Sequence, residues 1–177
     1  MQYLNVVDPE DTLKYFPALS VRKRFVGDEN ATLAVRGTST SQTARGVVYL
    51  DGLLLSNFMG NTHSYPPRWS MAFPDDIARV EVIYGAYSAL YPGNAIGAVV
   101  NMTTRMPEHL EISSDTQLFT QHVHTYRIDR NYGGNRKSAS IGDRVGRWSF
   151  LLEVSRLISN GQPLIYAPLP LGPMDVH

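Results

Sequence analysis

The sequence predicts an α+β fold, with a small mixed-sheet domain over residues 1–107, antiparallel β-strands over 108–160 and an irregular tail over 161–177. Three observations lead to this prediction. Short helical signals with proline at the first position occur twice before Pro107. Short apolar segments separated by glycine and turn residues alternate with those signals. Beyond Pro107 the segments become longer and alternate between polar and apolar residues, which is typical of antiparallel strands.

The first hundred residues contain all the predicted short elements. A short helix begins at Asp8-Pro9, because acids and a proline suit a first helical turn, and ends near Pro17. Two strands are expected over 19–25 and 31–36, and a continuous apolar strand over 46–50 ends at a turn with a short return over 53–55. A long loop, 56–74, precedes a helical turn at 74–79. Further elements are a strand over 80–84, a helical turn over 86–91 and a last strand over 98–104.

The segments after Pro107 are expected at 110–125, 137–143 and 147–159. Turn-rich residues at 131–135 and 143–146 separate them. Segments of about ten residues with alternating polarity and turns between them are typical of an outer-membrane barrel.

Composition and motifs exclude several classes of function. Lys and Arg balance Asp and Glu at 16 each, so no net field favours nucleic acid as a partner. The chain has no cysteine, and no ligand set stands at metal-site spacing, so neither a metal site nor a cofactor is expected. The region around Ser88 lacks the second glycine of a nucleophile elbow, and 93–97 lacks the Lys-Ser/Thr of a phosphate loop. No catalytic residue, and no enzyme, is therefore predicted.

Three ordered motifs carry a family resemblance. They are LAVRG at 33–37, YLDGLLL at 49–55 and RVEVIYGAYSALYPGNAIGAVVN at 79–101. Together they resemble the plug domain of TonB-dependent outer-membrane receptors, over roughly residues 12–105. Tyr84 stands where the family usually has arginine and Ala86 where it usually has proline, so the plug is expected to be a divergent one.

The resemblance implies a fold and a function. It implies a plug that gates a barrel of about 22 strands, of which this chain would hold the first few, as a truncated piece. Implied partners are the protein's own barrel, the periplasmic energising protein TonB, and a ferric siderophore or similar metal chelate, with cobalamin or a sugar as open alternatives. The implied location is the Gram-negative outer membrane. The piece itself is expected to be soluble, since it has no apolar run of about 18 residues.

The resemblance also points to candidate residues. Apical loops over 22–28, 38–45 and 56–70 would meet the substrate, and their candidates are Arg24, Thr40, Gln42, Asn57, His63, Tyr65 and Trp69. Arg36 and Glu81 are candidates for a charged latch between plug and barrel. Structural glycines are expected where the backbone turns or approaches another segment closely, at Gly37, Gly52, Gly85, Gly93 and Gly97.

A second interpretation remains open at this point. The chain is also compatible with a free-standing soluble β-rich binding or adhesion module whose final strands complete its own sandwich. That module would protect residues 137–159 strongly from hydrogen exchange as a dilute monomer, whereas orphan barrel strands would fray or pair with another copy.

Overall fold

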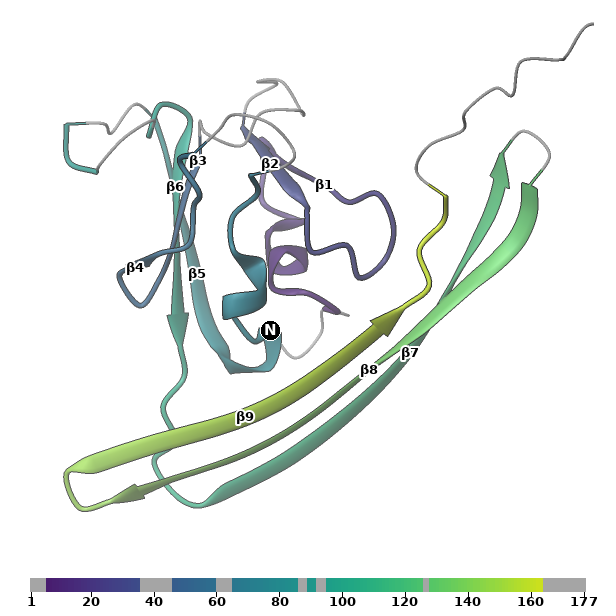
Figure 1. Ribbon diagram of the computed structural model, residues 1–177. Coiled ribbons are helices and arrows are strands. Elements are labelled where there is room, and N and C mark those ends of the chain that lie inside the picture. Colours follow the sequence, from purple (N-terminus) through teal and green to yellow (C-terminus); the bar gives the residue numbers. More distant parts are fainter. Residues whose placement is uncertain are drawn as a thin grey trace, which may run out of the picture.

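The computed structural model describes residues 6–35, 46–59, 65–85, 89–91, 95–125 and 128–163. Two parts are visible in Figure 1: an N-terminal domain up to Met106, and a long curved sheet formed by the strands that follow. The predicted fold class is confirmed, with mostly β structure and helical turns that are short and of the 3-10 type. Within the described residues no helix is long and apolar enough to cross a bilayer.

The described residues of the N-terminal domain form six short strands and three 3-10 helices. Its elements are η1 (Pro9–Leu13), β1 (Leu19–Arg22), β2 (Thr32–Val35), β3 (Gly46–Leu50), β4 (Leu53–Leu54), η2 (Trp69–Met71), η3 (Pro74–Asp76), β5 (Ile77–Tyr84) and β6 (Ala98–Thr104). Strands β1 and β2 form an antiparallel pair. The other four form a mixed sheet in the order β4-β3-β6-β5, in which β3 and β6 are parallel.

Local chemistry explains where these elements begin and end. At η1, proline occupies the first turn, and Asp11 Oδ2 accepts hydrogen bonds from the amides of Val7 and Asp8 at 3.0 Å each. The turn between β3 and β4 uses Asp51 and Gly52, both with positive φ, and the Asp51 carboxylate accepts the Thr104 amide at 2.9 Å. That bond fixes the β3–β4 turn to the end of β6.

The core lies between the mixed sheet and the segments around η1 and η2. Leu13, Leu33, Val48, Trp69 and Val100 are among its fully buried members. Burial of a side chain of this size contributes about 1.5–3 kcal/mol each, which is why a domain with so little helix still has a defined core. Trp69 is therefore part of the larger core cluster, and a second cluster contains Val47, Ala95 and Val99.

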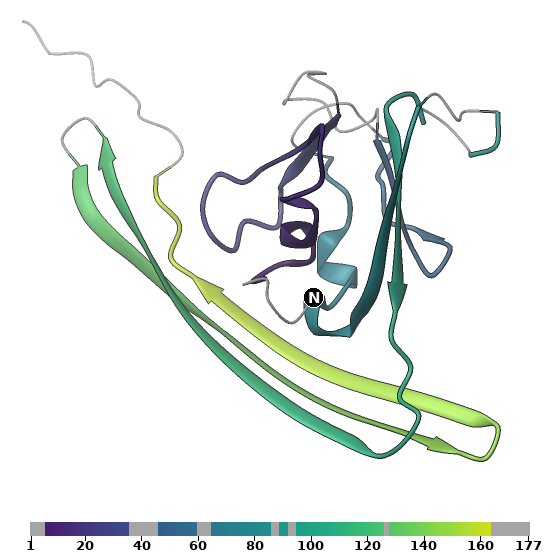
Figure 2. The ribbon, with the colours of Figure 1, turned by 180° about the vertical axis from the view of Figure 1, so that it is seen from behind.

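The curved sheet consists of β7 (Glu111–Thr125), β8 (Ile128–Val145) and β9 (Trp148–Ser159) in sequential antiparallel order. It curves around one side of the N-terminal domain, and Figure 2 shows the same arrangement from behind. Its concave face is directed towards the domain. Gly146, with a φ of 63°, occupies the two-residue turn between β8 and β9.

Two predictions about this sheet are wrong. Residues 131–135 do not separate two strands but lie inside β8, which pairs with β7 and β9 along this stretch, so its backbone hydrogen bonds continue. Gly134 serves close packing, because a Cβ there would lie 2.4 Å from the Phe119 ring and from the Ile158 carbonyl. The following turn is at Gly146-Arg147 rather than over 143–146.

Candidate functional site

The main contact between the two parts is an ion cluster around Arg136 of β8. Its side chain is 2 % exposed. The guanidinium donates to both carboxylate oxygens of Asp75 in η3, at 2.5 and 3.4 Å, and Ser138 Oγ donates to the same carboxylate at 2.8 Å. A forked arginine-carboxylate pair fixes orientation as well as distance. Asp75 is thereby held against the concave face of the sheet, and we call this contact the lower clasp.

The lower clasp contains more carboxyl groups than cations. Arg136 also lies 3.7 Å from Glu153 and 3.9 Å from Asp115, so three carboxylates surround one guanidinium. Both carboxylate oxygens of Glu153 are buried and have no hydrogen-bond partner among the described residues. Among the described residues Arg136 is the one cation within 4 Å of Asp75 and Glu153, so this contact depends strongly on it.

A second arginine extends the cluster along the chain connection. Arg105, which follows β6, lies 3.7 Å from Asp76 and 2.5 Å from Glu111 at the start of β7. Its backbone amide donates to the Asp76 carbonyl at 2.7 Å. Arg105 therefore ties η3 to the link between the domain and the sheet.

The lower clasp was not predicted from the sequence. Asp75 and Asp76 lie in the first turn after Pro74, where acids suit the helix dipole without any distant partner. The partner of Asp75 across the two parts, Arg136, lies 61 residues away, next to residues predicted as a turn. The one available signal was Arg136 itself, an arginine that alternates with Gly134 and Ser138 on a face otherwise made of small polar residues.

A second contact, the upper clasp, joins the loop after β1 to the other end of the sheet. The Val26 amide donates to Gln121 Oε1 at 3.2 Å, and Ser159 Oγ donates to the Val26 carbonyl at 2.5 Å. Gln162 Nε2 donates to the Arg24 carbonyl at 3.1 Å. Gly27 is required here, because its φ is 83° and a Cβ would lie 2.9 Å from Ser159 Cβ.

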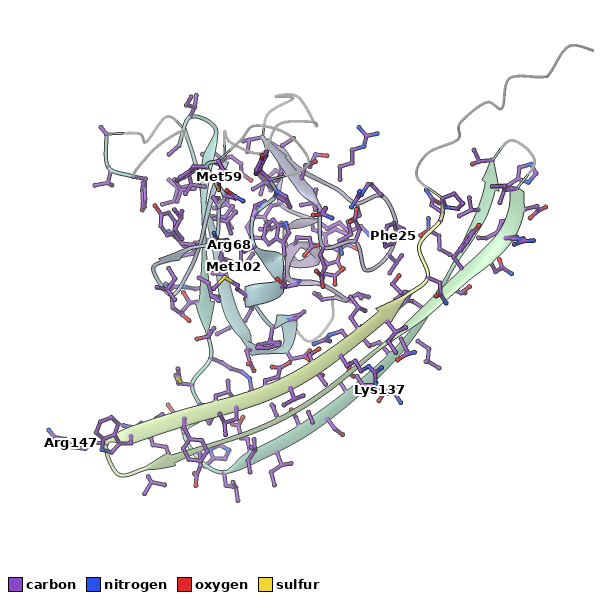
Figure 3. The ribbon with its side chains drawn as sticks, in the orientation of Figure 1. Phe25, Met59, Arg68, Met102, Lys137 and Arg147 are labelled. Atoms are coloured by element: carbon purple, nitrogen blue, oxygen red, sulfur yellow. The ribbon has the colours of Figure 1, made fainter. Side chains whose placement is uncertain are left out.

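The ammonium group of Lys23, which lies at the start of this loop, is surrounded by three carboxyl groups. Lys23 Nζ lies 2.6 Å from Asp8, 2.8 Å from Asp11 and 3.3 Å from Glu10. Beside this group is a cavity of about 460 Å³, whose lining includes Glu10, Lys14, Lys23, Phe25 and Gln121. Figure 3 shows Phe25 on the loop that faces the end of the curved sheet. Charged residues of the N-terminal domain thus line one side of the cavity, and Gln121 of β7 lines the other.

Glu10 gives this region a predicted pH dependence. Its side chain is fully buried, neither carboxylate oxygen has a hydrogen-bond partner among the described residues, and burial raises the pKa of Glu10 to about 8, against the attraction of Lys23. The folded chain keeps this proton while the unfolded chain releases it near its ordinary value of 4.5. The free energy of unfolding should therefore fall as the pH rises from about 5 to about 8.

The test compares Glu10→Gln with the unmodified chain by urea denaturation across this pH range. Glutamine has nearly the same shape as glutamate and cannot ionise. The decrease in the free energy of unfolding across this pH range should therefore be smaller in the variant by at least about 1 kcal/mol. Carboxylates elsewhere titrate equally in both proteins and cancel. Parallel pH profiles would show that Glu10 is ionised in the folded chain.

The predicted ligand candidates lie in different environments. Arg24 pairs with buried Asp28 at 2.6 Å, and although burial favours the neutral acid, bonds from Arg24 hold the pKa of Asp28 below its usual range. Asn57 is half-buried and accepts the Met59 amide at 3.1 Å, and Tyr65 is half-buried. Trp69 is 2 % exposed, and its indole donates to the Ala31 carbonyl at 2.9 Å. Thr40, Gln42 and His63 lie outside the described residues.

The predicted latch and glycines are only partly described. Glu81 projects from β5 and lies 3.3 Å from Arg79, with both side chains largely exposed, whereas Arg36, Gly37 and Gly93 lie outside the described residues. Gly52 and Gly85 have φ values of 82° and 143°. The Gly85 amide donates to the Gly97 carbonyl at 3.0 Å, which closes the segment between β5 and β6.

Comparisons with known proteins agree with this architecture. Residues 1–99 match the family model of the TonB-dependent Receptor Plug Domain. The vitamin B12 transporter BtuB of Vibrio vulnificus is 27 % identical over 118 residues, which cover 67 % of this chain and 18 % of that protein.

Solved structures show the same fold at low identity. The ferric enterobactin receptor PfeA of Pseudomonas aeruginosa, in complex with BCV-L6, has a TM-score of 0.63 and 19 % identity over 86 % of this chain and 22 % of its own. The siderophore receptor PirA of Acinetobacter baumannii has a TM-score of 0.63 and 17 % identity over 89 % of this chain and 23 % of its own.

This chain spans about a fifth of the length of the relatives that it matches. The family model, in contrast, covers more than half of the chain and includes strands β1 to β5 and the start of β6. On this evidence the chain belongs to the TonB-dependent receptor plug domain family.

Proposed function

We propose that the N-terminal domain is the plug of a TonB-energised transporter in the Gram-negative outer membrane, and that β7 to β9 are the first strands of its barrel. The observation that carries the proposal is that the domain is clasped to the polar concave face of a sheet whose exposed large apolar side chains lie on the convex face. A barrel strand in lipid has this polarity, with apolar residues outward and polar residues towards the lumen.

The concave face is suited to a lumen that holds a folded domain. Ser138 and Ser140 are buried there beside Arg136, and the contacts of both clasps are hydrogen bonds and ion pairs. Such contacts can be exchanged for water at a lower cost than a packed apolar interface of equal area. The plug is thereby positioned by specific contacts that a pull from the periplasm, transmitted by TonB, would release one after another.

The cargo that we propose is a ferric siderophore or a similar metal chelate. The structural relatives include a ferric enterobactin receptor and a siderophore receptor, and a sequence relative is a vitamin B12 transporter. The apical candidates Arg24, Asn57 and Tyr65, together with Thr40, Gln42 and His63, are proposed to meet the cargo. Trp69 is proposed to support them from the core, because its indole is already bonded to Ala31. Uptake of ferric enterobactin, of another ferric siderophore and of vitamin B12 should be measured in parallel in cells with and without the gene.

A reversible disulfide, which we call the tether, tests whether the plug must separate from the barrel strands during uptake. Asp75 and Ser138 are in contact across the lower clasp at 2.8 Å, and this chain contains no cysteine of its own. In the full-length protein, Asp75→Cys with Ser138→Cys should form a disulfide, while Arg136 keeps Glu153 and Asp115 as counter-charges. Oxidation should reduce uptake to background, and a reductant should restore it.

Each single-cysteine variant is the control for the tether, since it has the same loss of contact but cannot cross-link. Mass spectrometry confirms the disulfide. Full uptake through a protein whose disulfide is intact would contradict release of the plug at this junction.

A further inference from the structure

The convex face of the curved sheet exposes nine large apolar side chains, with polar residues among them and beyond them. Alternate residues on neighbouring strands share this face through the register, as in the row Ile112, Ile141 and Leu152. The large apolar residues exposed there are Ile112, Leu118, Ile141, Val145, Trp148, Phe150, Leu152, Val154 and Ile158. Trp148 and Phe150 mark one end of this apolar face, where aromatic residues commonly border the lipid.

Two cations interrupt this face side by side. Lys137 of β8 is paired in register with Arg156 of β9, and both side chains are exposed. Figure 3 shows Lys137 on the side of the sheet that faces away from the N-terminal domain. Residues directly opposite on an antiparallel pair have Cβ atoms about 4.5–5.5 Å apart, so two like charges here repel each other.

The convex face offers no acid nearby to compensate the pair. Within the described part of the sheet, the carboxylates on this face are Asp143, six residues along β8, and Asp129, eight residues along it in the other direction. At about 3.4 Å per residue these distances are roughly 20 and 27 Å, well beyond an ion pair. Neither Lys137 nor Arg156 forms an ion pair within the described residues.

The depth of the pair indicates what compensates it. Arg156 lies eight residues from Trp148 on the same face. At about 3.4 Å per residue and a tilt of about 40°, this is about 21 Å along the membrane normal, against an apolar band about 25 Å tall. The two long side chains therefore start just inside the far boundary of the band, and their charged ends reach the headgroup region.

We propose that Lys137 and Arg156 together bind the phosphate of a membrane lipid headgroup on the outer surface of the barrel. The guanidinium supplies a fork of donors and the ammonium a point charge, and a phosphate accepts from both at once. This site lies on the opposite face of the sheet from the plug and from the cargo. It rests on the proposed function, because the face meets lipid only if the strands are part of a barrel.

The experiment uses the full-length protein purified in a neutral detergent. Native mass spectrometry measures how much phosphatidylglycerol remains bound as the lipid is titrated, and phosphatidylcholine nanodiscs with and without phosphatidylglycerol give a second readout. Lys137→Gln with Arg156→Gln should weaken binding of phosphatidylglycerol on the order of 10- to 30-fold. The control, Lys14→Gln with Arg79→Gln, removes two positive charges from the N-terminal domain and should bind as the unmodified protein does.

The outcomes separate this site from the transporter itself. Unchanged lipid binding in the Lys137/Arg156 variant would overturn the site while leaving the transporter intact. Competition by inorganic phosphate as effective as lipid would also overturn it, because the site would then not select a headgroup. A full-length protein that does not enter nanodiscs at all would instead contradict the proposed function.

Discussion

Arg136→Met is expected to lower the free energy of unfolding by about 3–5 kcal/mol, which is typical of removing one partner from a buried ion pair. Methionine has a similar volume, so the loss reflects charge rather than a cavity. Asp75 and Glu153 would remain against the sheet, and neither has another cation within 4 Å among the described residues. Urea denaturation of the chain gives the value.

A neighbouring residue provides the control for this prediction. Lys137→Met changes the next residue of the same strand, removes the same charge and lies on the exposed convex face, so stability should change by less than about 0.5 kcal/mol. Adding Asp75→Asn to Arg136→Met should recover part of the loss, because a neutral amide tolerates the missing cation. Equal stability of the Arg136 and Lys137 variants would show that the lower clasp adds nothing to the fold.

Trp69→Ala is the second change with a large expected effect, a loss of about 3–5 kcal/mol. The indole is buried in the centre of the domain core, and its removal leaves a cavity and an unpaired Ala31 carbonyl. Trp69→Phe keeps most of the packing, so its loss of unfolding free energy should be smaller. The lost hydrogen bond accounts for about 0.5–1.5 kcal/mol, and the smaller ring adds a further small loss of packing. Denaturation monitored by circular dichroism compares the variants without relying on tryptophan fluorescence.

Trp148→Ala is the matched control, since it removes the same side chain from a position that is 81 % exposed. Its effect in the chain should stay within about 0.5 kcal/mol. A Trp69 variant that folds as stably as the unmodified chain but fails in cargo uptake would contradict the core role, and would support direct contact with the cargo.

The sequence was most informative where local chemistry decides the structure. Proline at the start of η1 and η3, the Asp51-Gly52 turn and the apolar strand of β3 each depend on residues close together in the chain, and all appear where predicted. The three family motifs added the order of the elements. They could do so because strands β2, β3, β5 and β6 each carry part of a motif.

The errors arose where distant partners decide the outcome. Residues 131–135 have the composition of a turn, yet pairing on both sides keeps them in β8, which local propensity does not reveal. The lower clasp was missed for the same reason, since nothing near Asp75 in the sequence indicates Arg136. The depth of Trp69 was equally hidden, because a loop composition gave no sign that its indole enters the core.

The ring of acids around Lys23 also has a mechanical consequence. Lys23 forms ion pairs with three acids near the start of the described chain, Asp8, Glu10 and Asp11. It also lies at the start of the loop in which Val26 contacts Ser159 of β9. Tension applied at Val6 would therefore reach the upper clasp through these ion pairs as well as along the backbone. The lower clasp is attached to the domain through η3 instead. The contacts of the upper clasp would therefore break first and those of the lower clasp later, rather than all at once.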